Sequence, residues 1–408
     1  MSKAAKPRGR KPAAAKGHQL PEPIPEGFEM TDTHKRRWKI GSLIGSGGFG
    51  TVYFASEAGK KTFDFVIKVE HHGNGPLFTE LHCYQNIGKP NDIAEWVKKN
   101  KLPFLGLSPM HGFGSFEFNG SKYRFMVIER YDKDLQKLFE ESNRRFPEKT
   151  VYQVGLSMIN VLEYIHAMGY VHGDIKPANL LLGRKKGTEN QVYLVDMGLA
   201  CKYQKDGVHK KDLPDPKKAH NGTPEFTSRD AHRGCFSRRT DMEILCYNLL
   251  QWLSGELPWE KYASDCKKLH QEKERYMKNI DEFLDVLNIS KTGGMKKLLS
   301  YVSKLGFEEE PDYNLCRKIF KDELKKLGCD KDTTLDFTNP NKVTQAAEAP
   351  VSDKENSKKA AKPTREKRKP EADVLLPPGI VPTQAMLDIM EKRASAKETK
   401  PTKTRRKK

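Results

Sequence analysis

The sequence predicts an α+β fold with a strand-rich N-terminal region, a larger helical C-terminal region and basic arms at both ends. Residues 38–54 alternate around a glycine turn, as the two strands of a hairpin do. Residues 151–165 carry apolar side chains three and four positions apart, which predicts a buried helix that stops at Gly169. Residues 1–37 and 340–408 are rich in Pro, Ala and Lys and lack a core-forming pattern, so we expect both arms to be disordered.

The composition excludes several classes of protein. The chain has 408 residues, of which 36% are hydrophobic and 31% charged, and its net charge is +19. No apolar run approaches the roughly 18 residues that a bilayer span needs, and residues 1–17 lack the apolar region of a secretory signal. The seven cysteines are scattered, which indicates reduced thiols in an intracellular protein. The positive charge favours a polyanionic partner, with nucleic acid the first expectation.

The glycine turn predicts a loop that lies over phosphate groups. It reads GSGGFGTV (45–52) and separates the first two expected strands. Glycines let backbone amides approach phosphate oxygens where a Cβ atom would collide. Dinucleotide-binding folds use the same glycine spacing but continue into a helix, whereas the residues after Gly50 continue as a strand. The Gly-Lys-Ser/Thr ending of a Walker loop is absent.

The next expected strand, at residues 65–69, carries a single lysine, Lys68. A strand lysine usually faces solvent, but the apolar flanks favour one that contacts nucleotide phosphates and pairs with a helix glutamate. Glu80 fits that partner, because Asn74 can cap a helix that starts at Gly75-Pro76. The alternatives are a solvent-facing Lys68 and a plain surface carboxylate at Glu80.

The strongest pattern follows the helix at residues 151–165 and reads YVHGDIKPANL (170–180). For phosphoryl transfer, Asp174 would orient the attacking hydroxyl and accept its proton, and Lys176 would neutralise charge on the transferred group. Asn179 would hold a metal ion. The expected strand at 192–195 ends at Asp196, a second ligand for Mg²⁺, which prefers few carboxylates together with phosphate oxygens and waters.

In this order and spacing, the motifs resemble those of a eukaryotic-type protein kinase over residues 38–330. Three stretches are similar to the vaccinia-related kinases, in the casein-kinase-one group: GTPEFTSRD (222–230), SRRTDMEIL (237–245) with GELPW (255–259), and KPNDIAEWVKKNKL (89–102) with SKYRFMVIERYDKDLQKL (121–138). The stretch at 89–102 predicts an extra helix. The resemblance implies a bilobal kinase fold with a small β-rich N-lobe and a larger helical C-lobe.

Composition and the resemblance together suggest how the whole chain is organised. A basic, disordered arm would occupy residues 1–37, and the kinase domain residues 38–330. A basic and largely disordered tail would follow at residues 331–408, with a short apolar segment at 374–390. That segment is either a frayed helix or one that docks on the folded domain or on a partner.

Carried over by position, the resemblance implies an ATP and Mg²⁺ site. The residues expected to cover ATP are Ile44, Gly45, Ser46, Gly47, Gly48, Phe49, Gly50, Thr51 and Val52. Lys68, paired with Glu80, would contact the phosphates. Ile128 would lie behind the adenine, which the backbone from Glu129 to Tyr131 would bind. Asn179 and Asp196 would hold the metal.

The same carry-over implies that Asp174, Lys176 and Lys68 are catalytic. Thr223 would lie opposite Asp174 and Lys176, as in serine/threonine kinases rather than tyrosine kinases. Asp241 would brace the backbone of the catalytic loop from below, which is a structural role.

Three departures from the family pattern have consequences. Gly173 replaces the arginine that commonly clamps a phosphorylated activation loop, so we expect activity that needs no such phosphorylation. Met197 replaces phenylalanine and should still pack. The usual Ala-Pro-Glu is Ser228-Arg229-Asp230, which leaves open whether Asp230 forms the buried ion pair of that glutamate or nothing does.

The arms carry basic motifs. RGRKP (8–12) resembles an AT-hook for the minor groove of A·T-rich DNA, with a generic basic tail as the alternative. The stretches at 358–370 and 403–408 resemble nuclear-import signals or polyanion contacts. Membrane attachment is not expected, because no lipidation motif accompanies them.

We therefore expect a monomeric, nuclear serine/threonine kinase, with a cytoplasmic pool also allowed. By the resemblance, it would phosphorylate chromatin proteins such as histone tails and barrier-to-autointegration factor, and its arms would contact DNA or nucleosomes. The alternatives are a catalytically dead scaffold recruited to chromatin by the arms, and a protein whose main task is DNA binding. Pseudokinases typically lack the strand lysine, the catalytic aspartate or the metal-binding aspartate. This chain has a residue of the required type at all three positions, Lys68, Asp174 and Asp196.

Overall fold

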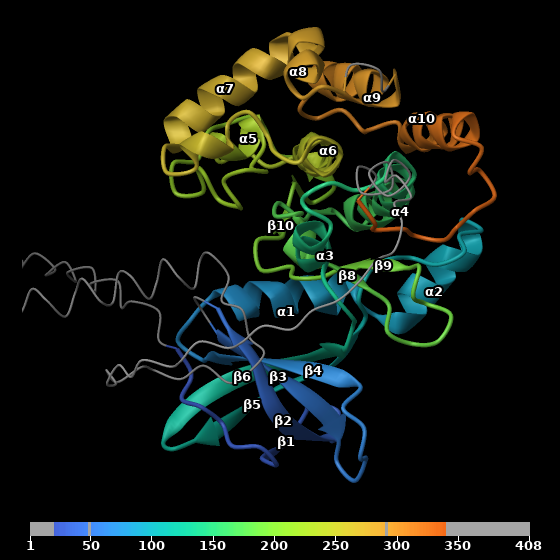
Figure 1. The fold of residues 1–408 in the computed structure, drawn as a ribbon. Helices are drawn as coiled ribbons and strands as arrows, with labels where there is room; N and C mark the ends of the chain where they lie inside the picture. The colour runs from blue at the N-terminus through green and yellow to red at the C-terminus, as the bar shows by residue number, and fades with distance from the viewer. Residues whose placement is uncertain (1–19, 48–49, 290–292, 340–408) are drawn as a thin grey trace, which may run out of the picture. The chain divides into compact units, whose positions relative to one another are not determined.

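A computed structural model describes residues 20–47, 50–289 and 293–339 of the chain. Its strands gather in the lower part of Figure 1 and most of its helices in the upper part, which gives the expected bilobal α+β arrangement. No helix in these three ranges is long and apolar enough to cross a membrane.

The N-terminal lobe is a six-stranded antiparallel sheet in the order β1-β2-β3-β4-β6-β5. Its strands are β1 (Glu29–Thr31), β2 (Arg37–Ser46), β3 (Gly50–Glu57), β4 (Phe65–His71), β5 (Met110–Phe118) and β6 (Ser121–Glu129). The sheet has its own apolar core, in which Trp38, Ile40 and Phe125 are fully buried. The predicted strands around the glycine turn and at residues 65–69 are confirmed as β2, β3 and β4.

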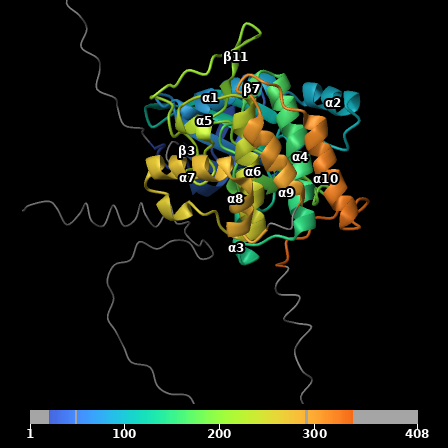
Figure 2. The ribbon, with the colours of Figure 1, turned by 90° about the horizontal axis from the view of Figure 1, so that it is seen from above.

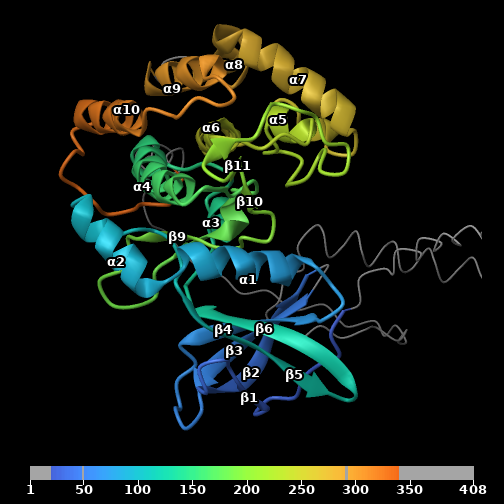
Figure 3. The same ribbon diagram turned by 180° about the vertical axis from the view of Figure 1, so that it is seen from behind.

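Two helices complete this lobe, α1 (Pro76–Ile87) and α2 (Pro90–Lys99). Helix α1 lies between the sheet and the C-terminal lobe (Figure 3). Its N-cap is Gly75 rather than the predicted Asn74, and the amide of Leu77 instead donates to the carboxylate of Glu70 on β4 at 3.2 Å. Helix α2 is the extra helix that the sequence predicts at residues 89–102.

The C-terminal lobe is mainly helical. Its helices are α3 (Leu135–Glu141), α4 (Glu148–Ala167), α5 (Arg229–His232), α6 (Arg238–Ser254), α7 (Cys266–Lys278), α8 (Ile280–Val286), α9 (Gly293–Lys304) and α10 (Tyr313–Lys326), with short 3₁₀ turns η1 (Pro177–Asn179) and η2 (Glu260–Tyr262). Three two-stranded ribbons pair β7 (Tyr170–Val171) with β10 (Cys201–Lys202), β8 (Leu180–Leu182) with β9 (Val192–Leu194), and β11 (Gln204–Lys205) with β12 (Val208–His209).

Helix α6 is the centre of this lobe and contacts α4, α5 and α9 (Figure 2). Every residue from Thr240 to Leu253 is buried, so the helix is enclosed on all sides rather than amphipathic. Helix α10 packs on α4 at close range: a Cβ atom at Gly155 would lie 2.9 Å from the ring of Phe320. The predicted helix at 151–165 is confirmed as α4.

The folded region extends beyond residues 38 and 330, the two ends expected for the kinase domain. Residues 29–31, placed by the sequence in a disordered arm, form β1 and pair with residues 37–39 of β2. Ile24 and Met30 are 4% exposed. At the other end, Asn339 donates to the carbonyl of Ser142 at 2.6 Å. These few buried residues were not predicted from the sequence, because charged residues dominate the composition around them. Residues 1–19 and 340–408, which include the RGRKP motif and the segment 374–390, lie outside the described ranges.

The question left open at Asp230 has a clear answer. The Asp230 carboxylate is 7% exposed and accepts hydrogen bonds from Arg239 at 2.5 and 2.9 Å and from Arg233 at 2.7 Å. Asp230 thus forms a buried ion pair with the start of α6. Burial would raise the pKa of Asp230, but the hydrogen bonds and charges of Arg239 and Arg233 outweigh it and hold the pKa below its ordinary value.

We predict that a chain starting at residue 38 is less stable than one starting at residue 20. The shorter chain loses β1 and the burial of Ile24 and Met30, and each buried aliphatic side chain contributes about 1.5–3 kcal/mol. Urea denaturation of the two proteins should show a lower free energy of unfolding for the shorter one, by about 3–5 kcal/mol. Equal stabilities would contradict the assignment of residues 20–37 to the sheet.

We also predict that Asp230→Asn destabilises the protein at neutral pH by about 2–4 kcal/mol, because two arginines lose their carboxylate. Since the folded-state pKa of Asp230 is depressed, its contribution is present above the ordinary carboxyl pKa of 3.8 and is lost as the pH falls through the folded value. Stabilities of the mutant and wild type should therefore converge below about pH 4. Asp215→Asn, in an exposed pair with Lys218, is the control and should cost little; a similar loss in both variants would contradict the prediction.

Candidate active site

Lys68, Glu80 and Asp196 come from three separate elements and meet at one point. The Nζ atom of Lys68 on β4 lies 2.8 and 3.0 Å from the two carboxylate oxygens of Glu80 on α1. It also lies 3.5 Å from Oδ1 of Asp196, which follows β9. Glu80 is only 3% exposed. This geometry contradicts both alternatives, a solvent-facing Lys68 and a surface Glu80.

The electrostatics of this group keep Lys68 charged. Burial would lower the pKa of Lys68, but the negative charges of Asp196 and Glu80 outweigh it and raise the pKa well above its ordinary value. The same positive charge lowers the pKa of Asp196, against the effect of burial. A protonated amine and an ionised carboxylate thus lie side by side, as an anionic phosphate and its metal ion require.

A second group forms around Asp174, in the loop between β7 and η1. Oδ2 of Asp174 accepts from Nζ of Lys176 at 2.8 Å. Oδ1 accepts from the backbone amide of Thr223 at 2.9 Å and from its hydroxyl at 2.8 Å. Lys176 also donates to the Thr223 hydroxyl at 3.1 Å. The structure therefore brings together the carboxylate, the lysine and the threonine that the sequence analysis singled out.

The backbone of this loop is hydrogen-bonded to a side chain of α6. Asp241 is fully buried and accepts hydrogen bonds from the amides of His172 at 2.7 Å and Gly173 at 2.8 Å. Gly173 has a φ of +77°, which suits glycine. The predicted bracing role of Asp241 matches these contacts.

Two further residues that support this loop were not predicted from the sequence. His166 of α4 places Nε2 3.0 Å from Asp241, and Nδ2 of Asn248 on α6 donates to the carbonyl of Ile175 at 3.0 Å. Asn248 had a usable signal, since it is a polar residue within the apolar stretch from Ile244 to Leu253. His166 had none, because its partner lies 75 positions away.

Asn179 and Asp196 offer the oxygen ligands expected for a divalent metal. Asn179 ends η1, and its amide nitrogen donates to the carbonyl of Asp174 at 3.0 Å. Its backbone carbonyl accepts the amide of Val195, which ties η1 to the residue before Asp196. Asp196 has a left-handed φ of +69°, a strained conformation that clusters at functional sites. One amide and one carboxylate fit Mg²⁺, with phosphate oxygens and waters as its other ligands.

A cavity of about 170 Å³ adjoins these residues and is lined by Gly47, Gly50, Lys68, Glu80 and Asp196 among others. Among the described residues other than chain neighbours, no atom lies within 4 Å of a Cβ atom built at Gly45, and at Gly47 the nearest is at 4.0 Å, so no described contact demands glycine there. A ligand that approaches the backbone closely would require glycine at both positions. At Gly50, by contrast, a Cβ atom would lie 2.5 Å from the carbonyl of Val69, so that glycine is explained by β3–β4 pairing. Gly48 and Phe49 lie outside the described residues.

The residues expected at the adenine form a more mixed set. Ile128 is buried at the end of β6, while Ile44 on β2 is 41% exposed. The side chain of Glu129 pairs with Lys185. The ring of Tyr131 stacks on Tyr193 with centroids 4.5 Å apart. The structure therefore leaves the backbone role of residues 129–131 a prediction.

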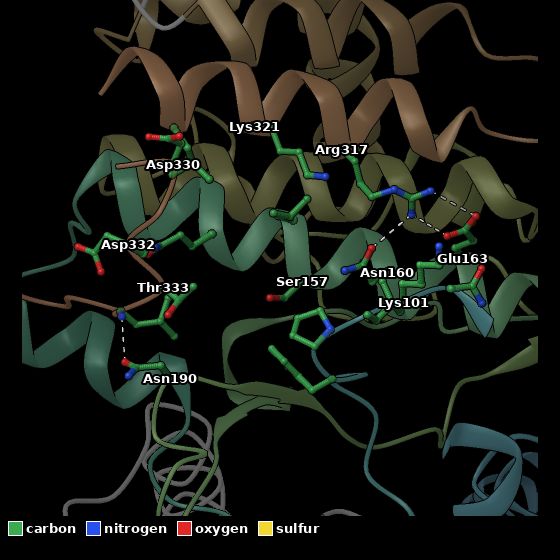
Figure 4. A pocket seen from close by; sticks show the side chains of 18 of the residues that line it. Lys101, Ser157, Asn160, Glu163, Asn190, Arg317, Lys321, Asp330, Asp332 and Thr333 are labelled. Carbon is green, nitrogen blue, oxygen red and sulfur yellow. Dashed lines mark hydrogen bonds and ion pairs between the residues drawn. The ribbon is translucent and has the colours of Figure 1, made fainter. Parts of the chain in front are cut away.

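A larger cavity, of about 520 Å³, lies away from all of these residues, between α4, α10 and the segments at 100–104 and 330–335 (Figure 4). Its charged side chains balance: Lys101, Arg317 and Lys321 against Glu163, Asp330 and Asp332. Arg317 already donates to Glu163 at 2.6 Å and to Asn160 at 3.3 Å. With balanced charge and none of the predicted residues in its lining, it is not the candidate active site.

Comparisons with known proteins identify the family of the chain. The protein kinase domain family matches residues 38–321. Nucleosomal histone kinase 1 of Drosophila melanogaster is 44% identical over 351 residues, which cover 83% of this chain and 58% of the fly protein. Serine/threonine-protein kinase VRK2 of Homo sapiens is 42% identical over 351 residues, covering 84% of this chain and 67% of that protein.

Among solved structures, vaccinia related kinase 3 matches with a TM-score of 0.67 and 28% identity, over 77% of this chain and 97% of the other. The family match covers most of the chain and contains every element of the candidate site. We conclude that the chain belongs to the protein kinase family, in its vaccinia-related branch of serine/threonine kinases.

Proposed function

We propose that the chain is an active kinase that transfers the γ-phosphoryl group of ATP to serine or threonine residues of nuclear, chromatin-associated proteins. The observation that carries this proposal is that two groups, Asp174–Lys176–Thr223 and Lys68–Glu80–Asp196, are joined through Asn179, which bonds both Asp174 and the residue before Asp196. One group fits the hydroxyl that is to be phosphorylated, and the other fits the phosphates that supply the phosphoryl group.

Each residue has a task that its position supports. Lys68, held in place by Glu80, would bind phosphate oxygens and fix their position. Asp174 would orient the attacking hydroxyl and accept its proton, while Lys176 would offset the negative charge on the transferred group. Asn179 and Asp196 would hold Mg²⁺, which neutralises charge on the phosphates when bound. Most of the catalysis then comes from positioning and electrostatics.

Two observations support chromatin proteins as substrates. The relative from Drosophila melanogaster is named nucleosomal histone kinase 1, although this chain spans only 58% of its length. The net charge of +19, concentrated in residues 1–37 and 340–408, suits a polyanion such as nucleosomal DNA. Histone tails are the first expected substrates and barrier-to-autointegration factor is a second. Nuclear localisation of a monomer fits the same proposal.

We predict that Asp174→Asn lowers the rate of phosphorylation of purified nucleosomes by about 10²–10⁴-fold, because it removes the proton acceptor. Labelled ATP with Mg²⁺ and mass-spectrometric mapping of the phosphorylated serines and threonines would measure this. Chelation of Mg²⁺ with EDTA should abolish transfer by the wild-type protein. Asp206→Asn, at an exposed turn, is the matched control and should retain activity. Equal labelling by wild type and Asp174→Asn would favour the scaffold alternative.

We further predict that activity does not depend on phosphorylation of the activation segment. Between Asp196 and Asp230, the only serines and threonines are Thr223, Thr227 and Ser228. Thr227 and Ser228 are buried, and Thr223 is bonded to Asp174. An arginine at position 173 would meet a backbone with φ of +77° and could not replace the missing clamp without strain.

Phosphatase-treated and repurified protein should therefore keep its initial rate within about twofold, as should the Ser228→Ala variant, although loss of its helix cap will lower stability by about 1 kcal/mol. A large loss of activity after phosphatase treatment that prior incubation with ATP restores would contradict this prediction.

A further inference from the structure

Lys273 is a buried lysine for which the proposed mechanism has no task. It lies on α7 and its exposed fraction is 0%. Among the described residues, it forms no ion pair with an aspartate or glutamate. Its Nζ atom instead lies 5.6 Å from the ring centroid of Tyr247 and 5.5 Å from that of Trp259. A hydrophobic side chain would fill this site at lower cost, so its amine calls for an explanation.

The amine binds the backbone of one segment. Nζ of Lys273 donates to the carbonyl of Pro224 at 2.7 Å and to that of Thr227 at 2.8 Å. The indole nitrogen of the neighbouring Trp259 donates to the carbonyl of Glu225, between them, at 2.9 Å. Three carbonyls within four residues are therefore held from one side.

The other side of this segment reaches the proposed site of transfer. Thr223 donates to Asp174 through both its amide and its hydroxyl. The hydroxyl of Thr227 donates to the carbonyl of Thr223 at 2.9 Å, which joins the two ends of the segment. The chain from Thr223 to Thr227 thus connects Asp174 to the interior of the lobe below α7.

The surroundings of Lys273 are fitted to an amine. His232 lies with Nε2 3.3 Å from Nζ, hydrogen-bonds His220 through Nδ1 at 2.8 Å, and stacks on His270. Burial lowers the pKa of Lys273 to about 7, against the opposing charges of Glu243 and Glu225. Whether charged or neutral, the amine keeps at least two hydrogens for the two carbonyls. The contacts at Pro224 and Thr227 therefore do not depend on its protonation state.

We propose that Lys273, assisted by Trp259, is a positioning residue that holds residues 223–227 against Asp174 so that a protein substrate can bind there. This inference rests on the proposed site at Asp174 and adds a determinant of protein-substrate affinity to it. Loss of the amine frees the carbonyls of Pro224 and Thr227 and releases the segment from below. Binding of ATP, which involves the opposite side of the site at Lys68, stays as it was.

Lys273→Met tests the proposal, because methionine has a similar volume and no hydrogen-bond donor. We expect the KM for purified histone octamers to rise at least about tenfold, as loss of hydrogen bonds worth about 1.4 kcal/mol would produce. The dissociation constant of ATP, measured separately by calorimetry, should change less than twofold. Lys267→Met, an exposed lysine on the same helix, is the matched control and should leave both values unchanged.

An unchanged KM for histones in a folded Lys273→Met protein would overturn the inference, as would an equal loss of histone and ATP affinity. If that variant does not fold, Trp259→Phe decides, because it removes the indole N–H donor and keeps a smaller aromatic ring. It should raise the KM for histones about threefold and speed amide hydrogen exchange at residues 223–228; no change in either overturns the inference. Asp174→Asn, assayed in parallel, separates the two proposals: its full activity would refute the site itself, whereas its inactivity beside an unaffected Lys273→Met refutes only the role of Lys273.

Discussion

The hydrogen bonds that converge on Asp241 are the constraint on which the active-site geometry depends. This carboxylate is fully buried in the central helix α6 and accepts the amides of His172 and Gly173, with His166 beside it. A carboxylate in such a place must have its partners, because an unpaired buried charge is very costly. The loop at residues 172–174 can therefore adopt few other conformations. Asp174 follows Gly173 directly, so its position is restricted as well.

The second group of the candidate site, Lys68, Glu80 and Asp196, comes from three separate elements. Lys68 lies on a strand, Glu80 on a helix packed across the sheet, and Asp196 in a loop of the other lobe. Opposite charges bring the three together, and they leave Lys68 protonated and Asp196 ionised. The same interaction links the lobes and leaves a positive and a negative charge side by side.

The segment between Asp196 and α6 is held by its own set of charged contacts. Asp230 binds two arginines, and Arg229 pairs with Glu243 of α6 at 2.9 Å. Lys273 binds the carbonyls of Pro224 and Thr227, in the part of the segment that contacts Asp174. These contacts hold the segment from within the chain itself, although Gly173 stands where most kinases have an arginine.

Local spacing by itself determined the strands around the glycine turn, the strand of Lys68 and the helix at 151–165. It also singled out Asp174, Lys176, Asn179 and Asp196 as candidate site residues. These signals are local, because periodicity and short motifs act within a few residues. Only the tertiary structure decided that β1 joins the sheet, that Glu70 rather than Asn74 meets the start of α1, and that Gly50 serves strand pairing. It also decided the roles of His166, Asn248 and Lys273. The partners described above lie 41 to 75 positions away in the chain, and only packing determines which distant groups share a buried space.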